Sequence, residues 1–79
     1  MEKRKLLDRI TVNPKVMVGK PTLRGLRITV EQILIALASD ISVNDIMEDY
    51  PELEVDDIKA ALIYAAELVK EEQIFAIAQ

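Results

Sequence analysis

The segment Gly19–Val30 constrains the fold of this chain more than any other, because it contains both glycines of the sequence. Pro21 fixes its own φ angle and pushes Lys20 toward an extended conformation, so no helix can continue through this point. Gly25 can adopt a positive φ angle without strain because it has no Cβ atom, whereas most other residues cannot. We therefore predict structural turns at Gly19–Pro21 and at Gly25, with short strands around the second turn.

Two arginines, Arg24 and Arg27, bracket the predicted turn at Gly25. A guanidinium group can donate two parallel hydrogen bonds to a phosphate or a carboxylate. The segment is therefore either a binding element or a hairpin that fixes the N-terminus to a helical body and carries solvated arginines. Both interpretations stay open at this stage.

Charge is distributed unevenly along the chain. Residues 1–30 contain eight cations against two acids, a net charge of +6, whereas residues 31–79 contain two lysines against twelve acids, a net charge of −10. A basic half suits nucleic acid and an acidic half suits a basic partner, unless the halves offset each other within one fold or across a dimer. The eight cations are Lys3, Arg4, Lys5, Arg9, Lys15, Lys20, Arg24 and Arg27.

Hydrophobic periodicity predicts helices after residue 29. Thr29 is positioned to cap the first helix, which ends near Ser39. Ser42 starts a capping-box spacing for a short second helix, which must stop by Tyr50 because Pro51 follows.

A third helix is predicted from about Val55 to at least Val69. Ile63 and Tyr64 lie off its main apolar stripe, and the tail adds Ile74 and Phe75, so we predict that these four residues bind a partner. Packing in the core or a dimer is the alternative, and it is favoured over ligand binding. The predicted core stripe is Ile58, Ala61, Leu62, Ala65 and Leu68.

The N-terminal part is predicted to be irregular. Residues 2–8 form either a short basic helix or a frayed arm, Arg9–Val12 alternates like a strand, and Val16–Val18 is a second short apolar run. These pieces suggest a small β element. We therefore expect one domain overall, with a basic N-terminal arm and short strands in residues 1–30, and a helical body with an apolar C-terminal tail in residues 31–79.

The predicted fold class is mainly α: a three-helix, helix-turn-helix-like bundle of homeodomain-like or winged-helix-like type, with a small irregular N-terminal β element. The third helix begins with four carboxylates, which a phosphate backbone would repel. We therefore assign nucleic-acid binding to cations outside this helix. The assigned residues are Lys3, Arg4, Lys5, Lys20, Arg24 and Arg27.

The composition argues against an enzyme. The chain contains no cysteine and no histidine, which removes the usual nucleophile, the commonest general base and the strongest zinc ligands. Asp56 and Asp57 are paired acids at a helix start, which are usually just solvated. No cofactor or metal is expected. The N-terminus lacks a signal-peptide pattern and no window resembles a membrane span, so a cytoplasmic location is expected.

A set of residues spread over about residues 9 to 66 matches the sequence pattern of a known family. It resembles the domain-of-unknown-function 433 family, whose members look like VapB-type antitoxins that are often partnered with a PIN-like ribonuclease toxin. The resemblance implies a helix-turn-helix-like fold and a dimer. The matching residues are Ile10, Asn13-Pro14, Gly19-Lys20-Pro21, Arg24-Gly25, Arg27-Ile28, Val30, Ile46, Tyr50-Pro51, Leu53, Asp57-Ile58 and Ala60-Ala61-Leu62.

The expected function combines this resemblance with the charge asymmetry. The chain is expected to be an antitoxin-like homodimer that neutralises a PIN-like ribonuclease and binds its own promoter DNA. The alternative is a stand-alone dimeric protein-interaction or structural module with no DNA or toxin role. Family members usually have Gly-Thr-Arg where this chain has Gly25-Leu26-Arg27, so any contact made by that threonine hydroxyl is absent.

Overall fold

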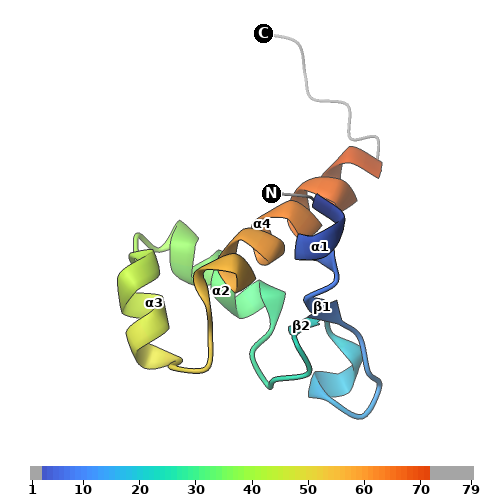
Figure 1. The fold of residues 1–79 in the computed structure, drawn as a ribbon, viewed down its shortest axis with the longest axis horizontal. Coiled ribbons are helices and arrows are strands. Elements are labelled where there is room, and N and C mark those ends of the chain that lie inside the picture. Colours follow the sequence, from blue (N-terminus) through green and yellow to red (C-terminus); the bar gives the residue numbers. More distant parts are fainter. Residues whose placement is uncertain (1–2, 72–79) are drawn as a thin grey trace, which may run out of the picture.

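The computed structural model of the chain describes residues 3–71. Within this range the protein is mainly helical, with four α-helices and a small two-stranded antiparallel sheet. Figure 1 shows their arrangement. The elements are α1 (Lys3–Leu7), β1 (Ile10–Thr11), a one-turn element η1 (Met17–Gly19), β2 (Thr22–Leu23), α2 (Val30–Ala38), α3 (Val43–Asp49) and α4 (Val55–Glu71).

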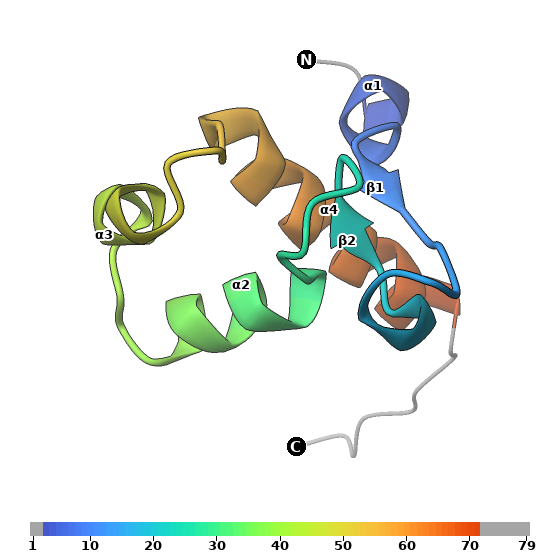
Figure 2. The same ribbon diagram turned by 90° about the horizontal axis from the view of Figure 1, so that it is seen from below.

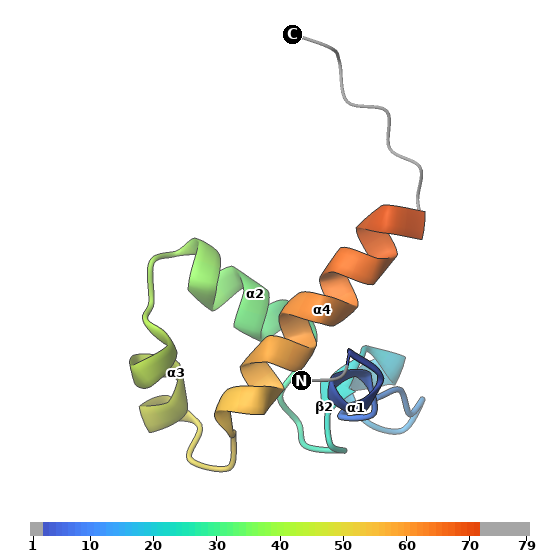
Figure 3. The ribbon, with the colours of Figure 1, turned by 45° about the horizontal axis from the view of Figure 1, so that its top comes forward.

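The long helix α4 is the scaffold of the fold. It contacts α1, α2, α3 and β1. Figures 1 and 3 show α2 and α3 on one side of α4, and α1 with the sheet on the other side. The core is therefore built from both sides of one helix. Its buried apolar residues are Leu6, Leu23, Ile28, Val30, Ile33, Ile46, Leu53, Ile58, Ala60 and Ala61.

The predicted starts of α2 and α3 are confirmed by their caps. Thr29 Oγ1 accepts from the Gln32 N–H at 3.0 Å, while Gln32 Oε1 accepts from the Thr29 N–H at 2.8 Å, which completes a capping box. Ser42 Oγ accepts from the Asp45 N–H at 3.1 Å, and no reciprocal bond is found within residues 3–71. Between these helices Asp40 adopts the left-handed conformation, with φ 65°.

The small sheet pairs β1 with β2, with Ile10 opposite Leu23 and Thr11 opposite Thr22. Figure 2 shows the two strands lying next to α1. The side-chain oxygens of Thr11 and Thr22 lie 3.0 Å apart, which is a hydrogen bond inside the sheet. An isolated bridge then joins Thr22 to Thr29, so the chain that leaves β2 returns beside it before α2 begins.

The two predicted turns are both present. Gly25 has φ 73° and follows Arg24, which also has a positive φ of 48°. The Leu26 N–H donates to the carbonyl of Leu23 at 2.8 Å and closes this turn. Gly19 has φ 77°, and the carbonyl of Pro21 accepts from the first residue of α2 at 3.0 Å. The glycine-containing segment thus positions both the sheet and α2.

The apolar run Val16–Val18, predicted to be part of the β element, is not a strand. Three successive residues, Met17, Val18 and Gly19, have φ angles of 50°, 56° and 77°. Hydrogen bonds at this point turn the chain, because the Val16 N–H donates to the Asn13 carbonyl at 2.9 Å and the Gly19 N–H donates to the Val16 carbonyl at 3.1 Å. An extended strand cannot form across these bonds.

The predicted core stripe of α4 is partly wrong. Ile58 and Ala61 are buried as expected, but Leu62 is 48% exposed. Ile63 and Tyr64 are half-buried and pack against the core. The reason is that α1 and β1 cover a second side of α4. The buried surface of this helix is therefore wider than the single predicted stripe and extends toward Ile63 and Tyr64.

Candidate functional site

The start of α4 holds a cluster of ion pairs around Asp57, whose side chain is 0% exposed. Arg24 donates from Nη2 to Asp57 Oδ2 at 2.9 Å and from Nε to Oδ1 at 3.0 Å. Arg9 donates from Nη1 to Asp57 Oδ1 at 3.0 Å. The Glu54 N–H donates to Asp57 Oδ2 at 2.8 Å, which is half of a capping box for α4. Asp57 thus joins two N-terminal segments to this helix.

These contacts change the acidity of the cluster. Burial raises the pKa of Asp57. Hydrogen bonds donated by Arg24, by the Glu54 N–H and by Arg9 lower it, and their combined effect is larger than that of burial, so the pKa lies below the ordinary value of 3.8. The pKa of Arg24 is raised by its hydrogen bond to Asp57. The carboxylate and both guanidinium groups are therefore charged at neutral pH.

This lowered pKa predicts an acid-sensitive contribution to stability. A carboxyl group whose pKa is lower in the folded state stabilises the fold fully above its unfolded pKa, and this contribution is lost as the pH falls through the folded pKa. The difference in unfolding free energy between wild type and Asp57→Asn should therefore shrink as the pH falls below the ordinary aspartate pKa of 3.8. Urea unfolding of both proteins at a series of pH values measures it. A difference independent of pH would contradict the assigned pKa shift.

Arg9 also neutralises the other carboxylates at the start of α4. It donates to Glu54 Oε1 at 2.7 Å, and its Nη2 lies 3.8 Å from Asp56 Oδ2. Three of the four acids expected to repel phosphate at this helix start are thus paired with cations of the N-terminal third, and Glu52 is the exception. The uneven charge of the sequence left open that the two halves offset each other within one fold, but it could not indicate which residues pair.

Three of the six cations predicted to bind nucleic acid form ion pairs within the chain. One is Arg24, in the cluster just described. Lys3 Nζ lies 2.6 Å from Glu67 Oε1, and Lys20 Nζ lies 2.7 Å from Glu31 Oε1. These two lysine pairs are exposed, so they are weak and open to exchange with solvent.

The other three predicted cations are Arg4, Lys5 and Arg27, and all three are exposed. None of them forms an ion pair with another side chain of residues 3–70, the side chains that the structure describes. Their charge is therefore available to a ligand. Their role in nucleic-acid binding stays a prediction.

Arg27 belongs to a hollow with a volume of about 470 Å³, which we call the cationic hollow. Three of its lining residues are cations and none is a carboxylate. Val18, at 93% exposure, is the most exposed large apolar side chain of the described residues. The lining residues are Pro14, Lys15, Met17, Val18, Lys20 and Arg27.

The acidic surface that carries unpaired charge lies elsewhere, on α3 and its flanking turns, and we call it the acidic lobe. Its five carboxylates are exposed, and none forms an ion pair within the described part of the chain. Figures 1, 2 and 3 place α3 and the light-blue loop around η1 at opposite ends of the molecule. The lobe consists of Asp40, Asp45, Glu48, Asp49 and Glu52.

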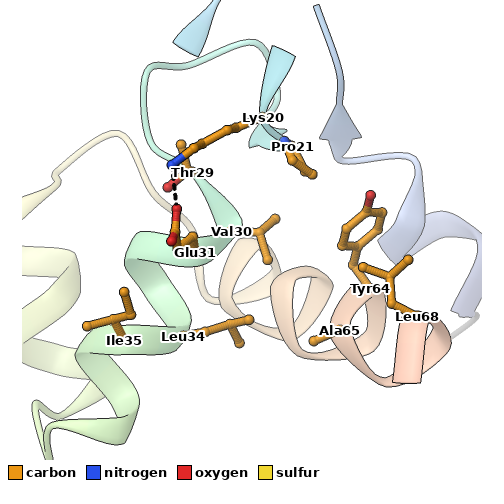
Figure 4. A pocket seen from close by; sticks show the side chains of 10 residues that line it. All are labelled: Lys20, Pro21, Thr29, Val30, Glu31, Leu34, Ile35, Tyr64, Ala65 and Leu68. Atoms are coloured by element: carbon orange, nitrogen blue, oxygen red, sulfur yellow. Dashed lines mark hydrogen bonds and ion pairs between the residues drawn. The ribbon is translucent and has the colours of Figure 1, made fainter. Parts of the chain in front are cut away.

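An apolar groove of about 450 Å³ lies between α2 and α4. Figure 4 shows the side chains of α2 on one side, those of α4 on the other, and the Lys20–Glu31 ion pair at the edge. The groove is open and mostly apolar, which suits a protein segment better than a charged ligand. It is lined by Lys20, Pro21, Thr29, Val30, Glu31, Leu34, Ile35, Tyr64, Ala65 and Leu68.

The predicted partner-binding residues fall in different places. Tyr64 lines the apolar groove and also a second hollow next to β1. Ile63 packs against the core and is only half-exposed. Ile74 and Phe75 lie outside the described residues. The structure thus brings one of the four predicted residues into an open apolar surface.

The helices offer little that suits direct reading of DNA bases. The first turn of α4 is covered by the arginines bound to Asp57. The short helix α3 contains three acids and no cation. Eight of the ten cations lie in residues 1–30, so we expect most phosphate contacts to come from that part of the chain.

The chain matches the sequence model of a known protein family. A family model described as "Protein of unknown function (DUF433)" matches residues 10–65. The chain belongs to the DUF433 family. The matched region contains the cationic hollow, the acidic lobe, the Arg24–Asp57 pair and all of the groove except Leu68. The features described above are thus carried by the DUF433 region.

A relative of this DUF433 chain is the uncharacterised protein y4eO of Sinorhizobium fredii (strain NBRC 101917 / NGR234), which is 34% identical over 56 residues. The aligned region is 71% of this chain and 25% of the relative, so the chain spans about a quarter of that protein. No solved structure matches the chain.

Within residues 3–71 no group of three or more carboxylates is arranged to hold a metal ion. In the same range, no helix has both the length and the apolar character needed to cross a membrane.

Proposed function

We propose that this DUF433 chain is an antitoxin-like binding protein that neutralises a PIN-like ribonuclease and binds its own promoter DNA. The observation that carries the proposal is the separation of charge, with the cationic hollow and the acidic lobe at opposite ends of the molecule. Two surfaces of opposite charge on one small chain suit two different macromolecules. The resemblance of the family to VapB-type antitoxins supports the same division.

The acidic lobe is the surface proposed to face the nuclease. A ribonuclease must present cations to hold the phosphates of RNA. The unpaired carboxylates of the lobe are complementary to such a surface, and this complementarity speeds association and orients the partner. In the complex the lobe would occupy part of the surface that otherwise binds RNA.

The apolar groove is proposed to receive an apolar segment of the same nuclease. α2 forms one wall of the groove and also packs against α3, which carries the lobe, so one partner can cover both surfaces. The predicted partner residue Tyr64 lies in this groove. Buried apolar contact at the centre of an interface supplies most of the affinity, whereas the charged rim contributes mainly to rate and specificity.

We also propose that the chain forms a homodimer in the cytoplasm, with a helix-turn-helix-like arrangement of α2, α3 and α4. A domain of about 80 residues obtains only about 3–5 kcal/mol of stability from its own core. Association of two copies would add to that value. Pairing would also bring two cationic hollows to one DNA molecule.

The test is co-expression with a candidate PIN-like nuclease from a neighbouring gene, with growth and complex formation as readouts. Ile35 is 58% exposed in the groove, so Ile35→Lys should leave the fold intact. We expect this variant to weaken the complex by about 30-fold or more and to lose protection against growth arrest. The matched control is Val69→Lys, because Val69 is 60% exposed and does not line the groove.

Equal behaviour of Ile35→Lys and Val69→Lys would exclude the groove as the nuclease site. The oligomeric state of each variant alone, measured by light scattering, identifies the other occupant. If Ile35→Lys makes a dimer monomeric and leaves nuclease binding unchanged, a second copy of the chain fills the groove. Absence of any complex with the nuclease would favour the stand-alone dimeric module.

A further inference from the structure

The loop around η1 combines two features that packing does not explain. Val18 has φ 56° and ψ 36°, a left-handed conformation that is a genuine outlier for a β-branched residue. The same side chain is 93% exposed, so burial does not compensate for the strain. Strained residues of this kind concentrate at functional sites.

Hydrogen bonds hold this strained loop in one conformation. Asn13 Oδ1 accepts from the Lys15 N–H at 2.9 Å, and the Lys20 N–H donates to the Met17 carbonyl at 3.1 Å. The Gly19 N–H donates to the Val16 carbonyl at 3.1 Å. The loop therefore presents its side chains from a fixed backbone, which lowers the entropy cost of binding a ligand.

The side chains presented by this loop are cationic. Lys15 and Arg27 are exposed, line the cationic hollow and form no ion pair within the described residues. Lys20 lines the same hollow, and its pair with Glu31 is exposed. Because the acidic lobe lies on the far side of the molecule, an anionic ligand approaching the hollow is not repelled by it.

We propose that the cationic hollow binds the phosphodiester backbone of duplex DNA, with Arg27 and Lys15 each contacting a phosphate and Val18 contacting the adjacent deoxyribose. Arg27 donates a planar fork to phosphate oxygens, whereas Lys15 acts as a point charge. These contacts position the protein on DNA without reading its sequence. The proposal rests on the DNA-binding half of the proposed function and gives it a site that includes Lys15, Met17 and Val18.

An anionic membrane surface is the other ligand with phosphate chemistry, and the geometry favours DNA. A projecting strand backbone can enter a concave site, whereas a flat lipid surface contacts mainly its rim. Val18 is the one exposed large apolar side chain among the described residues of this site, and one valine buries too little apolar surface for stable membrane insertion.

The experiment measures binding of a mixed-sequence DNA duplex by fluorescence anisotropy over a range of salt concentrations. The variant Lys15→Ala/Arg27→Ala should bind about tenfold more weakly at low salt, and its slope of log K against log salt should be smaller by about 1.8. The control Lys59→Ala/Lys70→Ala removes the same charge from exposed positions on α4, outside the hollow. It should bind as wild type does. Arg24 is left unchanged because it stabilises Asp57.

Val18→Asn separates a binding role from a structural role. Asparagine tolerates the left-handed conformation better than valine, so the thermal midpoint should stay the same or rise. Binding of the duplex should nevertheless weaken about threefold, because the apolar contact is lost. A lower midpoint with unchanged binding would mean that Val18 serves the fold, and it would remove this residue from the proposed site.

Three outcomes would overturn the proposal. If wild type binds the duplex and both double variants weaken it equally, DNA binding is retained but the hollow is not its site. If wild type does not bind the duplex, both this proposal and the DNA-binding half of the proposed function fail. Phosphatidylserine-containing vesicles form the second arm, and loss of vesicle binding in Lys15→Ala/Arg27→Ala with unchanged DNA binding would assign the hollow to lipid instead.

Discussion

Replacing Asp57 with asparagine is expected to lower the free energy of unfolding by about 3–5 kcal/mol, because removing one partner of a buried ion pair leaves the other charges uncompensated. Asp57 is fully buried and accepts hydrogen bonds from Arg9, Arg24 and the Glu54 N–H. The neutral amide has the same shape but cannot balance two guanidinium groups. A loss of this size approaches the whole stability of a domain of this length.

The matched control for this change is Asp56→Asn. Asp56 is the preceding residue, its side chain is 31% exposed, and its one ion-pair distance is 3.8 Å, to Arg9. Exposed pairs of this kind contribute about 0–1 kcal/mol. Urea unfolding followed by circular dichroism compares the two variants. Similar losses in both would show that general negative charge at the helix start, and not the buried cluster, stabilises this region.

The second large effect is expected for Leu23→Ala, which should lower the free energy of unfolding by about 2–5 kcal/mol. Leu23 is 0% exposed and lies in β2, between the turn at Gly25 and the strand partner Ile10. Deleting its side chain removes apolar contact and leaves a cavity where the sheet meets the helices. The sheet has two residues in each strand, so it has little capacity to collapse around that cavity.

Leu62→Ala is the control that matches the chemistry of this change. Leu62 is 48% exposed on α4, and alanine is a better helix former than leucine. We expect a loss of less than about 1 kcal/mol for this variant. If Leu62→Ala proved as damaging as Leu23→Ala, Leu62 would have to be buried against another chain in solution, and the interface between copies would include this side of α4.

The helices could be predicted from the sequence because their signals are local. Thr29 and Ser42 supply capping oxygens, and Pro51 ends the second helix at the preceding residue. Gly25 and Asp40 likewise mark positions with positive φ angles through their own chemistry. Each of these signals involves residues within a few positions of one another, so no tertiary information was required.

The features that could not be predicted depend on contacts between distant segments. Arg24 and Asp57 are separated by 33 positions, and no local pattern indicates that they meet. Helical periodicity alone predicts that Leu62 lies in the core and Tyr64 outside it. It contains no information that α1 covers a second side of α4, which is why both predictions differ from the structure. Valine prefers the extended backbone of a strand, so β propensity predicts a strand at Val18. The observed left-handed turn is contrary to that preference.

For the candidate site, composition gives the charges but not their pairing. The sequence shows that residues 1–30 are basic and residues 31–79 acidic, but it cannot show which of these charges form internal ion pairs. Arg24 is one of those consumed, whereas Arg27, three positions later, is exposed and unpaired within residues 3–71. Only the structure separates these two arginines.

The buried carboxylate has an evolutionary consequence. A substitution at position 57 alone would remove the one carboxylate that pairs with Arg24, and a substitution at position 24 alone would leave the buried carboxylate with Arg9 as its remaining cation, so either single step is costly. Homologous sequences should therefore change these two positions together, with a neutral residue at one accompanied by a neutral residue at the other. The exposed positions 15 and 27 are not paired with a buried carboxylate, so either of them can change alone at little cost in stability.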